Sequence, residues 1–256
     1  MRFTRTLFTT ALFGASVFSF QSTAWADTLE QQFQQGLTAY EQSNYQTAFK
    51  LWLPLAEQGN AKAQYNLGVM YGNGRGVKQD YFKAVNWYRK AAEQGHADAQ
   101  LNLGYMYEKG RGVKQDDFEA VKWYRQAAEQ GNAEAQFNLG NMYADGRGVK
   151  QDNFEAVKWY RKAAEQGYAE AQGSLGVMYQ SGRGVKQDGV EAVNWFRRAA
   201  EQGYATAQAL LGFLYLLGER GVQVNKSLAK EWFGKACDNG HQAGCEYYGK
   251  LNRGEL

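Results

Sequence analysis

Proline is nearly absent from this sequence of 256 residues: Pro54 is the single one, beside 30 glycines. Proline removes a backbone hydrogen bond and breaks helices, so its scarcity is compatible with a mostly helical chain. An excess of charge is lacking as well, because the formal net charge is +3. Nucleic-acid binding usually requires a concentrated basic face, so the composition gives that class of partner no support.

Side chains suited to metal binding are also scarce. The two histidines, His96 and His241, lie far apart in the sequence and share no cluster with cysteine or carboxylate at the spacing of a zinc site. The glycine-rich Gly-Arg-Gly-Val segments lack the Gly-Lys-Ser/Thr ending of a phosphate-binding loop. We therefore expect neither a metal nor a cofactor.

The first 26 residues have the features of an export signal. Arg2 and Arg5 precede an uncharged apolar run over residues 7–20, and Ala24-Trp25-Ala26 places small residues at the positions that a signal peptidase recognises. A membrane anchor is the alternative, but the run is shorter than the ~20 apolar residues that span a bilayer. We expect residues 1–26 to be removed and the mature chain to be periplasmic or secreted, without stable membrane insertion.

An internal repeat dominates the rest of the sequence. The heptad Gly-Arg-Gly-Val-Lys-Gln-Asp occurs four times at a spacing of 36 residues, and a tryptophan follows each copy. Repeats of this length are typical of solenoids built from stacked units. We place five repeats at residues 60–95, 96–131, 132–167, 168–203 and 204–240, with a shorter helix pair at 27–59 before them and a capping helix at 241–256 after them.

Each repeat is predicted to form two helices. Ala63, Leu67 and Met70 fall on one apolar face of the first helix, and Ala84 and Trp87 begin a similar face in the second. Aspartates that can cap the second helix, each followed three residues later by a glutamate that completes a capping box, are Asp116, Asp152 and Asp188. A pair this small cannot bury both faces alone, so stacked pairs must share one core.

The repeat resembles a known family. Its pattern is Ala-x-Ala-Gln-x-x-Leu-Gly-x-Met-Tyr, then Gly-x-Gly-Val-x-x-Asp, then Ala-x-x-Trp-x-x-x-Ala-Ala. This pattern resembles the Sel-one-like repeat family, a branch of the tetratricopeptide-like superfamily, over nearly all of the mature chain. The resemblance implies an all-α fold, a right-handed α-solenoid of antiparallel helix pairs, and a role as an adaptor for other proteins. The fifth repeat departs from the pattern, with Leu214 in place of methionine and an extra residue near Gly221.

Two cysteines are present, Cys237 and Cys245. Aligned with the fourth repeat, the first lies at the end of a second helix and the other at the start of the next helix. An exported protein reaches an oxidising compartment, so we expect a disulfide across this turn that fastens the last helix. Two buried free thiols are the alternative. The eight-residue spacing is also similar to that of the secreted cysteine-rich branch of the family.

One catalytic pattern occurs in the chain. Ser227-Leu-Ala-Lys230 matches the Ser-x-x-Lys motif of penicillin-recognising enzymes. These residues stand where Val190 and Val193 stand in the fourth repeat, on an ordinary second helix, and neither Ser-Asp-Asn nor Lys-Thr-Gly occurs. We assign no catalytic residue and expect no enzyme, with binding or hydrolysis of a β-lactam or cell-wall peptide as the alternative.

Comparison of the repeats with one another identifies a candidate binding surface. Positions that vary lie three and four residues apart on one stripe of the first helix, and in tetratricopeptide-like solenoids the first helices line the concave surface. We predict that this variable stripe binds another protein or peptide, with Tyr65, Leu101, Tyr105 and Phe137 as exposed anchors. The alternative is that nothing constrains these positions. The variable stripe comprises Lys62, Tyr65, Val69, Asp98, Leu101, Tyr105, Glu134, Phe137, Asn141, Val177 and Phe213.

The loops between the helices form a second candidate surface. Stacking would align Arg75, Arg111, Arg147 and Arg183 as a basic loop edge, which would suit an anionic partner such as a polysaccharide or lipid head group. The alternative is that each arginine bonds helix-end carbonyls. The sequence thus predicts an exported scaffold for protein–protein interaction through a concave surface, and an interaction with host surfaces is a further alternative. The oligomeric state stays open.

Overall fold

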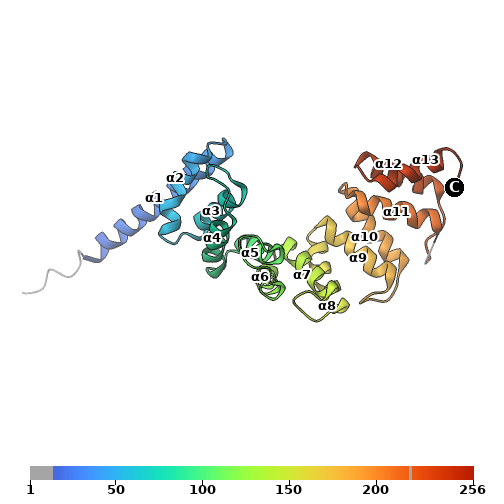
Figure 1. Cartoon of the computed structure of the whole chain (residues 1–256), viewed down its shortest axis with the longest axis horizontal. Coiled ribbons are helices and arrows are strands. Elements are labelled where there is room, and N and C mark those ends of the chain that lie inside the picture. Colours follow the sequence, from blue (N-terminus) through green and yellow to red (C-terminus); the bar gives the residue numbers. More distant parts are fainter. Residues whose placement is uncertain (1–13, 219–220) are drawn as a thin grey trace, which may run out of the picture. The chain divides into compact units, whose positions relative to one another are not determined.

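Helices make up almost all of the described structure (Figure 1). This computed structural model describes residues 14–218 and 221–256, and within these ranges thirteen helices and no strand occur. The helices are α1 (Gly14–Glu41), α2 (Tyr45–Glu57), α3 (Ala61–Asn73), α4 (Tyr81–Glu93), α5 (Ala97–Lys109), α6 (Asp117–Glu129), α7 (Ala133–Asp145), α8 (Asn153–Glu165), α9 (Ala169–Ser181), α10 (Gly189–Glu201), α11 (Ala205–Leu217), α12 (Lys226–Asp238) and α13 (Gln242–Asn252). Half of the predicted export signal, residues 1–13, lies outside the described residues, and the backbone of α1 continues across Ala26 and Asp27.

The chain divides into two compact units, Met1–His96 and Ala97–Leu256. In the first, α1 packs on α2, α2 on α3, and α3 on α4. In the second, the pairs α5–α6, α7–α8, α9–α10 and α11–α12 follow one another, and each second helix also packs on the first helix of the next pair. Within each unit, the helices of a pair therefore pack on each other, and successive pairs pack on one another. The predicted all-α solenoid of helix pairs is confirmed.

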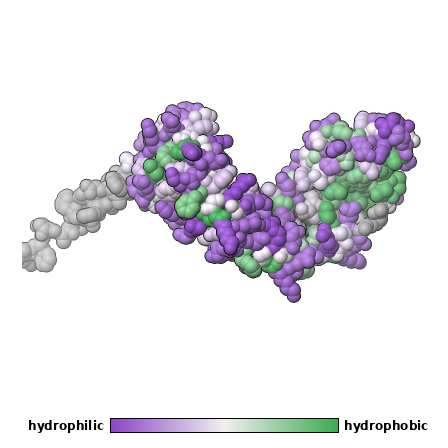
Figure 2. Space-filling model, viewed as in Figure 1, coloured by the Kyte–Doolittle hydropathy of each residue, from purple (hydrophilic) through white to green (hydrophobic). Residues whose placement is uncertain are grey.

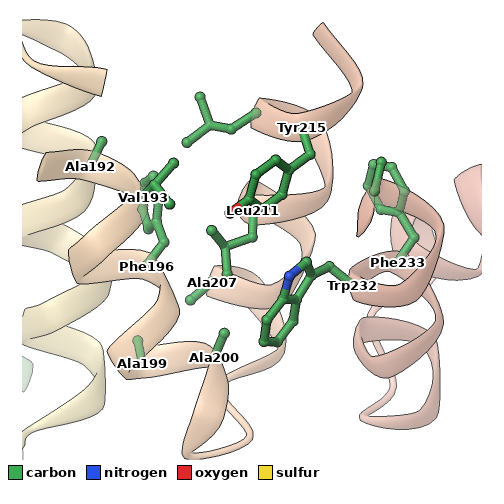
Figure 3. Packing of buried hydrophobic residues seen from close by; sticks show 12 residues of the cluster. Ala192, Val193, Phe196, Ala199, Ala200, Ala207, Leu211, Tyr215, Trp232 and Phe233 are labelled. Carbon is green, nitrogen blue, oxygen red and sulfur yellow. The ribbon is translucent and has the colours of Figure 1, made fainter. Parts of the chain in front are cut away.

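A constant glycine in the first helix of each repeat allows the second helix to approach closely. A Cβ atom added at Gly68 would lie 2.5 Å from the ring of Tyr88, and one added at Gly176 would lie 2.6 Å from the ring of Phe196. Such distances leave no room for any side chain at these positions. Figure 3 shows the result in the C-terminal unit, where Phe196 of α10 and Phe233 of α12 belong to one cluster with Leu211 of α11.

The second helices α6, α8 and α10 are each capped by an aspartate, as predicted. In α6 the Asp116 carboxylate accepts hydrogen bonds from the backbone N–H groups of Phe118 and Glu119, at 3.0 and 3.1 Å. The other half of the predicted capping box does not form. The Asp116 N–H donates to the Tyr107 carbonyl at 3.0 Å, while the Glu119 carboxylate accepts from Lys122 at 3.1 Å. The turn between the helices already satisfies the cap N–H group, so the glutamate is left to form an ion pair on the helix surface.

Buried glutamines connect successive repeats. Gln136 is 4% exposed, and its amide donates to the Ala128 carbonyl at 3.0 Å, in the preceding second helix. Its carbonyl oxygen accepts a hydrogen bond of 2.8 Å from Gln166, at the end of its own repeat's second helix. A buried polar group costs free energy unless it is paired, and these bonds pair both ends of the amide. The constancy of this glutamine in the repeats therefore has a structural cause.

The two cysteines form the predicted disulfide. Cys237 near the end of α12 is bonded to Cys245 in α13, with the Cα atoms 4.4 Å apart. The bond closes a loop with a sequence separation of 8 residues. It attaches α13 covalently to the helix on which it packs.

Candidate partner-binding site

The first helices α5 and α7 enclose a pocket of about 280 Å³. Three residues of the variable stripe, Tyr105, Glu134 and Asn141, lie in its wall. Other lining residues are Glu108, Lys109 and Arg147. The structure thus brings the variable stripe together with one arginine of the predicted basic loop edge. The wall carries both signs of charge beside an aromatic ring that is 37% exposed, which suits a polar, partly aromatic contact.

Charged hydrogen bonds fix the wall of this pocket. Glu108 accepts from the Tyr124 hydroxyl at 2.7 Å, from Lys109 at 2.7 Å and from Arg147 at 3.1 Å. Burial by itself would raise the pKa of Glu108, but these three hydrogen bonds outweigh it and lower the pKa. Arg147 also binds Asp117 at 2.9 Å. One guanidinium thereby holds together carboxylates of two helices, α5 and α6.

Several predicted anchors are less accessible than the sequence suggested. Leu101 is 8% exposed and belongs to a core cluster with Leu139 and Trp159, so the prediction that it is an exposed anchor is wrong. Phe213 is half-buried, with its ring 4.9 Å from that of Phe233 and 4.6 Å from that of Tyr247. Of the remaining stripe residues, Lys62, Asp98, Tyr105 and Glu134 are exposed, and Tyr65, Val69, Phe137, Asn141 and Val177 are half-buried.

The half-buried aromatic residues pack against the residue that precedes the next first helix. In the N-terminal unit Tyr65 stacks on His96 with ring centroids 4.7 Å apart. In the C-terminal unit Phe137 lies 5.4 Å from Tyr168, and the ring of Tyr204 covers Gly173. In these three repeats the variable residue packs against the residue before the next first helix, a role that neither of the two interpretations of the sequence included.

The arginines of the basic loop edge are engaged with side chains rather than free. Arg75 donates to the Tyr40 hydroxyl at 2.6 Å, and Arg183 donates to the Ser181 hydroxyl at 3.2 Å. Arg111 lies 5.5 Å from the centre of the Tyr105 ring. Arg75, Arg147 and Arg183 thus donate hydrogen bonds to side chains in their surroundings. The lysines of the same loops, Lys78, Lys114, Lys150 and Lys186, are exposed.

The Ser-x-x-Lys pattern forms no catalytic pair in the structure. Ser227 is exposed in the first turn of α12, and the Lys230 ammonium lies 5.9 Å from the centre of the Tyr248 ring. Within the described ranges no group of three or more His, Cys, Asp and Glu side chains is placed to hold a metal ion. Nor is any described helix long and apolar enough to cross a membrane.

Sequence reasoning missed exposed phenylalanines at the start of three second helices. Phe82, Phe118 and Phe154 are 65, 76 and 69% exposed. They lie off the apolar face on which Ala84 and Trp87 lie, and this mismatch with helical periodicity was the signal available in the sequence.

Figure 2 shows mostly hydrophilic residues over the middle of the chain, with hydrophobic residues gathered over the C-terminal part.

Comparison with known protein families agrees with the repeated helix pairs of the fold. The model of the Sel1 repeat matches six segments, residues 33–60, 61–96, 97–132, 133–168, 169–204 and 205–241. The chain belongs to the Sel1 repeat family. Sel1 repeats form a scaffold that is generally used for protein–protein interaction, and Sel1 repeat proteins are generally not enzymes.

Two solved structures are similar over most of the chain. One is a protective antigen of uropathogenic Escherichia coli strains with the same fold, 37% identical, with a TM-score of 0.84 over 93% of this chain and 52% of that protein. The chain thus spans about half the length of that antigen. The other is a Sel1 repeat protein from Oxalobacter formigenes, 36% identical, with a TM-score of 0.80 over 86% of this chain and 87% of that protein. A search of curated proteins by sequence gave no match.

Proposed function

We propose that the mature chain is an exported scaffold that binds a partner protein or peptide on the surface formed by its first helices. The observation that carries this proposal is the pocket between α5 and α7, where Tyr105, Glu134 and Asn141 meet. The exposed stripe residue Asp98 lies on the same first helix α5 outside the pocket, and an aromatic residue placed like Tyr105 often dominates binding energy. This surface corresponds to the concave side of tetratricopeptide-like solenoids.

Export is supported by two independent features. The basic start, apolar run and small residues before Asp27 have the order of a signal peptide. The disulfide between Cys237 and Cys245 is of the kind that persists in oxidising compartments. We expect intact-mass analysis of the protein from the extracytoplasmic fraction to give a chain that starts at Asp27. A chain that retains its first 26 residues would contradict this cleavage.

Photo-crosslinking tests the binding surface. A photoreactive phenylalanine analogue at position 105 would probe the pocket, and the same analogue at position 118 would probe a more exposed site on a second helix. In an extracytoplasmic extract of the producing organism, we expect a discrete crosslinked band from position 105 that is weak or missing from position 118. Replacement of Glu134 and Asn141 by Ala should remove the band. Equal labelling from both positions would contradict the proposal.

A further inference from the structure

Two tyrosines of the C-terminal unit occupy a position at which other repeats have a capping residue. Asn132 caps α7, and its side chain accepts a hydrogen bond of 2.9 Å from the Ala135 N–H. Tyr168 and Tyr204 stand at the same position before α9 and α11 and make no side-chain cap hydrogen bond. Because an asparagine here would stabilise the helix, the tyrosines give up a local contribution to stability.

The two tyrosines instead add aromatic surface beside the variable stripe. The ring of Tyr168 lies against Phe137, with centroids 5.4 Å apart. Tyr204 lies so close to Gly173 that an added Cβ atom there would be 2.9 Å from its ring. Both tyrosines are half-buried, so part of each side chain remains accessible to a ligand.

Glu134 and Glu170 each lie one helical turn before a residue that these rings contact, Phe137 in α7 and Gly173 in α9, so both carboxylates lie on the helix faces that the rings contact. The pKa of Tyr168 is raised to about 12, mainly by burial. The charges of Glu170 and Glu134 and the neighbouring Tyr204 also contribute to this rise. The pKa of Glu134 is raised as well, chiefly because its carboxylate is partly buried and further because of the negative charges of Glu170 and Asp98. Each of these acidic residues comes from a different first helix, α5, α7 or α9. In the described part of the chain none of them has a salt bridge.

We propose that Tyr168, Tyr204, Glu134 and Glu170 bind a lysine or arginine side chain within a basic segment of the partner. The face of an aromatic ring attracts a cation, and a carboxylate forms a strong charge-assisted hydrogen bond with it. A neutral or acidic partner would leave the like charges of the carboxylates uncompensated. Since one carboxylate recurs in each of three successive repeats, the row suits an extended chain with several cations better than a single small ion.

This inference rests on the proposed function, because it assigns a chemistry to the partner of the same surface. Its probe is a fluorescein-labelled oligolysine peptide, titrated by fluorescence anisotropy against the mature protein, residues 27–256, at low salt. Glu134→Gln with Glu170→Gln removes both charges without changing side-chain size, and we expect binding to weaken by about tenfold or more. Tyr168→Asn and Tyr204→Asn each introduce the capping residue of another repeat, and each should weaken binding by about threefold or more.

The matched control is Glu119→Gln with Glu155→Gln. It removes the same charge from the second helices, where both glutamates pair with lysine. Unchanged binding by this control would assign the effect to the site. An equal loss in the control, or undiminished binding in the site variants, would overturn the proposal.

The crosslinking experiment separates this inference from the proposed function. A discrete band from position 105 together with no measurable binding of oligolysine would leave the scaffold intact and overturn the basic partner. Binding of an oligoglutamate peptide at equal strength would overturn it as well, because the carboxylates repel such a chain. Circular dichroism of every variant should match the parent, since the exchanged side chains lie at the surface of the helices.

Discussion

The ring of Phe137 lies against the ring of Tyr168, which belongs to the next repeat, with centroids 5.4 Å apart and planes tilted by 44°. The same two positions hold Tyr65 and His96 in the N-terminal unit, where the rings are stacked. At Tyr65, Phe137 and Gly173 the residue of the first helix is therefore matched by the residue that precedes the following first helix. A partner bound at Phe137, as we propose, would also meet Tyr168.

A double-mutant cycle measures this coupling. Phe137→Ala alone should destabilise the protein, while Tyr168→Asn loses a ring contact and gains a cap hydrogen bond, so its net effect should be small. Aromatic pairs contribute about 0.5–1.5 kcal/mol beyond their buried area, and we expect a coupling free energy of that size between the two substitutions. Urea denaturation of the four proteins checks it. Additive effects would show that the rings touch without stabilising each other.

Replacing two glycines of α3 by alanine, one at a time, should change the stability of the protein in opposite directions. At Gly68 a Cβ atom would lie 2.5 Å from the Tyr88 ring, whereas at Gly72 the nearest atom, the Tyr88 hydroxyl oxygen, would be 3.6 Å away. Gly72→Ala should stabilise the protein by about 0.5–1 kcal/mol, because alanine favours a helix. Gly68→Ala should destabilise it by about 1–3 kcal/mol through overpacking.

Thermal denaturation followed by circular dichroism compares these two variants with the parent. The melting temperature should rise for Gly72→Ala and fall for Gly68→Ala. A higher melting temperature for both variants would mean that α4 can move away from α3 at little cost in free energy.

The periodic sequence predicted the fold because each repeated residue has one packing role. The constant glycine faces an aromatic ring, the constant glutamine links two repeats, and the aspartate caps a helix. Each of these roles depends on contacts at a fixed separation in the sequence, so the repeated copies reveal it. The cysteine pair was predictable for a similar reason, because the repeat places Cys237 and Cys245 on either side of one turn.

The candidate site was less predictable, because it depends on contacts that occur once. Nothing in the repeat shows that Leu101 turns into a core cluster while Tyr105, one helical turn later, stays exposed. Arg147 differs from Arg75 because Glu108 and Asp117 are carboxylates in its surroundings, whereas Arg75 meets the hydroxyl of Tyr40. Such differences depend on which residues face each other in three dimensions, and the spacing of residues in the sequence does not predict that.

Glu108, which accepts hydrogen bonds from Lys109, Tyr124 and Arg147, makes stability depend on pH in a defined direction. Hydrogen bonds lower the pKa of Glu108 despite its burial, so this group stabilises the fold above the pKa of an unfolded glutamate. That contribution is lost as the pH falls through the lowered pKa of the folded state. Arg147→Ala should therefore raise the pKa of Glu108 and destabilise the protein by about 1 kcal/mol at neutral pH, and by less in acid.

Carboxyl carbon chemical shifts across a pH titration report the pKa of Glu108 directly, and urea denaturation at neutral and acidic pH reports stability. The control is Lys114→Ala, which removes one positive charge from an exposed loop side chain. It should leave both readouts near those of the parent. A pKa of Glu108 that stays low in Arg147→Ala would mean that Lys109 and Tyr124 suffice.

Glu134 should show the opposite dependence on pH. Partial burial and the charges of Glu170 and Asp98 raise its pKa, so the folded state binds its proton more tightly than the unfolded state. The group therefore lowers stability as the pH rises through the range between the two pKa values. Glu134→Gln should raise the melting temperature at pH above that range and have little effect below it. A drop in melting temperature at neutral pH would show that a cation in the protein already compensates the carboxylate.

The disulfide should stabilise one end of the chain and leave the other repeats unchanged. Cys237→Ser with Cys245→Ser opens a loop with a sequence separation of 8 residues, and the chain-entropy treatment of such loops gives a loss of about 2–3 kcal/mol. Because α13 packs chiefly on α12, it should be the first helix to detach. Hydrogen exchange followed by mass spectrometry should then show lost protection in Gln242–Asn252 and parental protection in α5 to α8. Uniform loss of protection from α5 to α13 would mean instead that the C-terminal unit unfolds as one cooperative block.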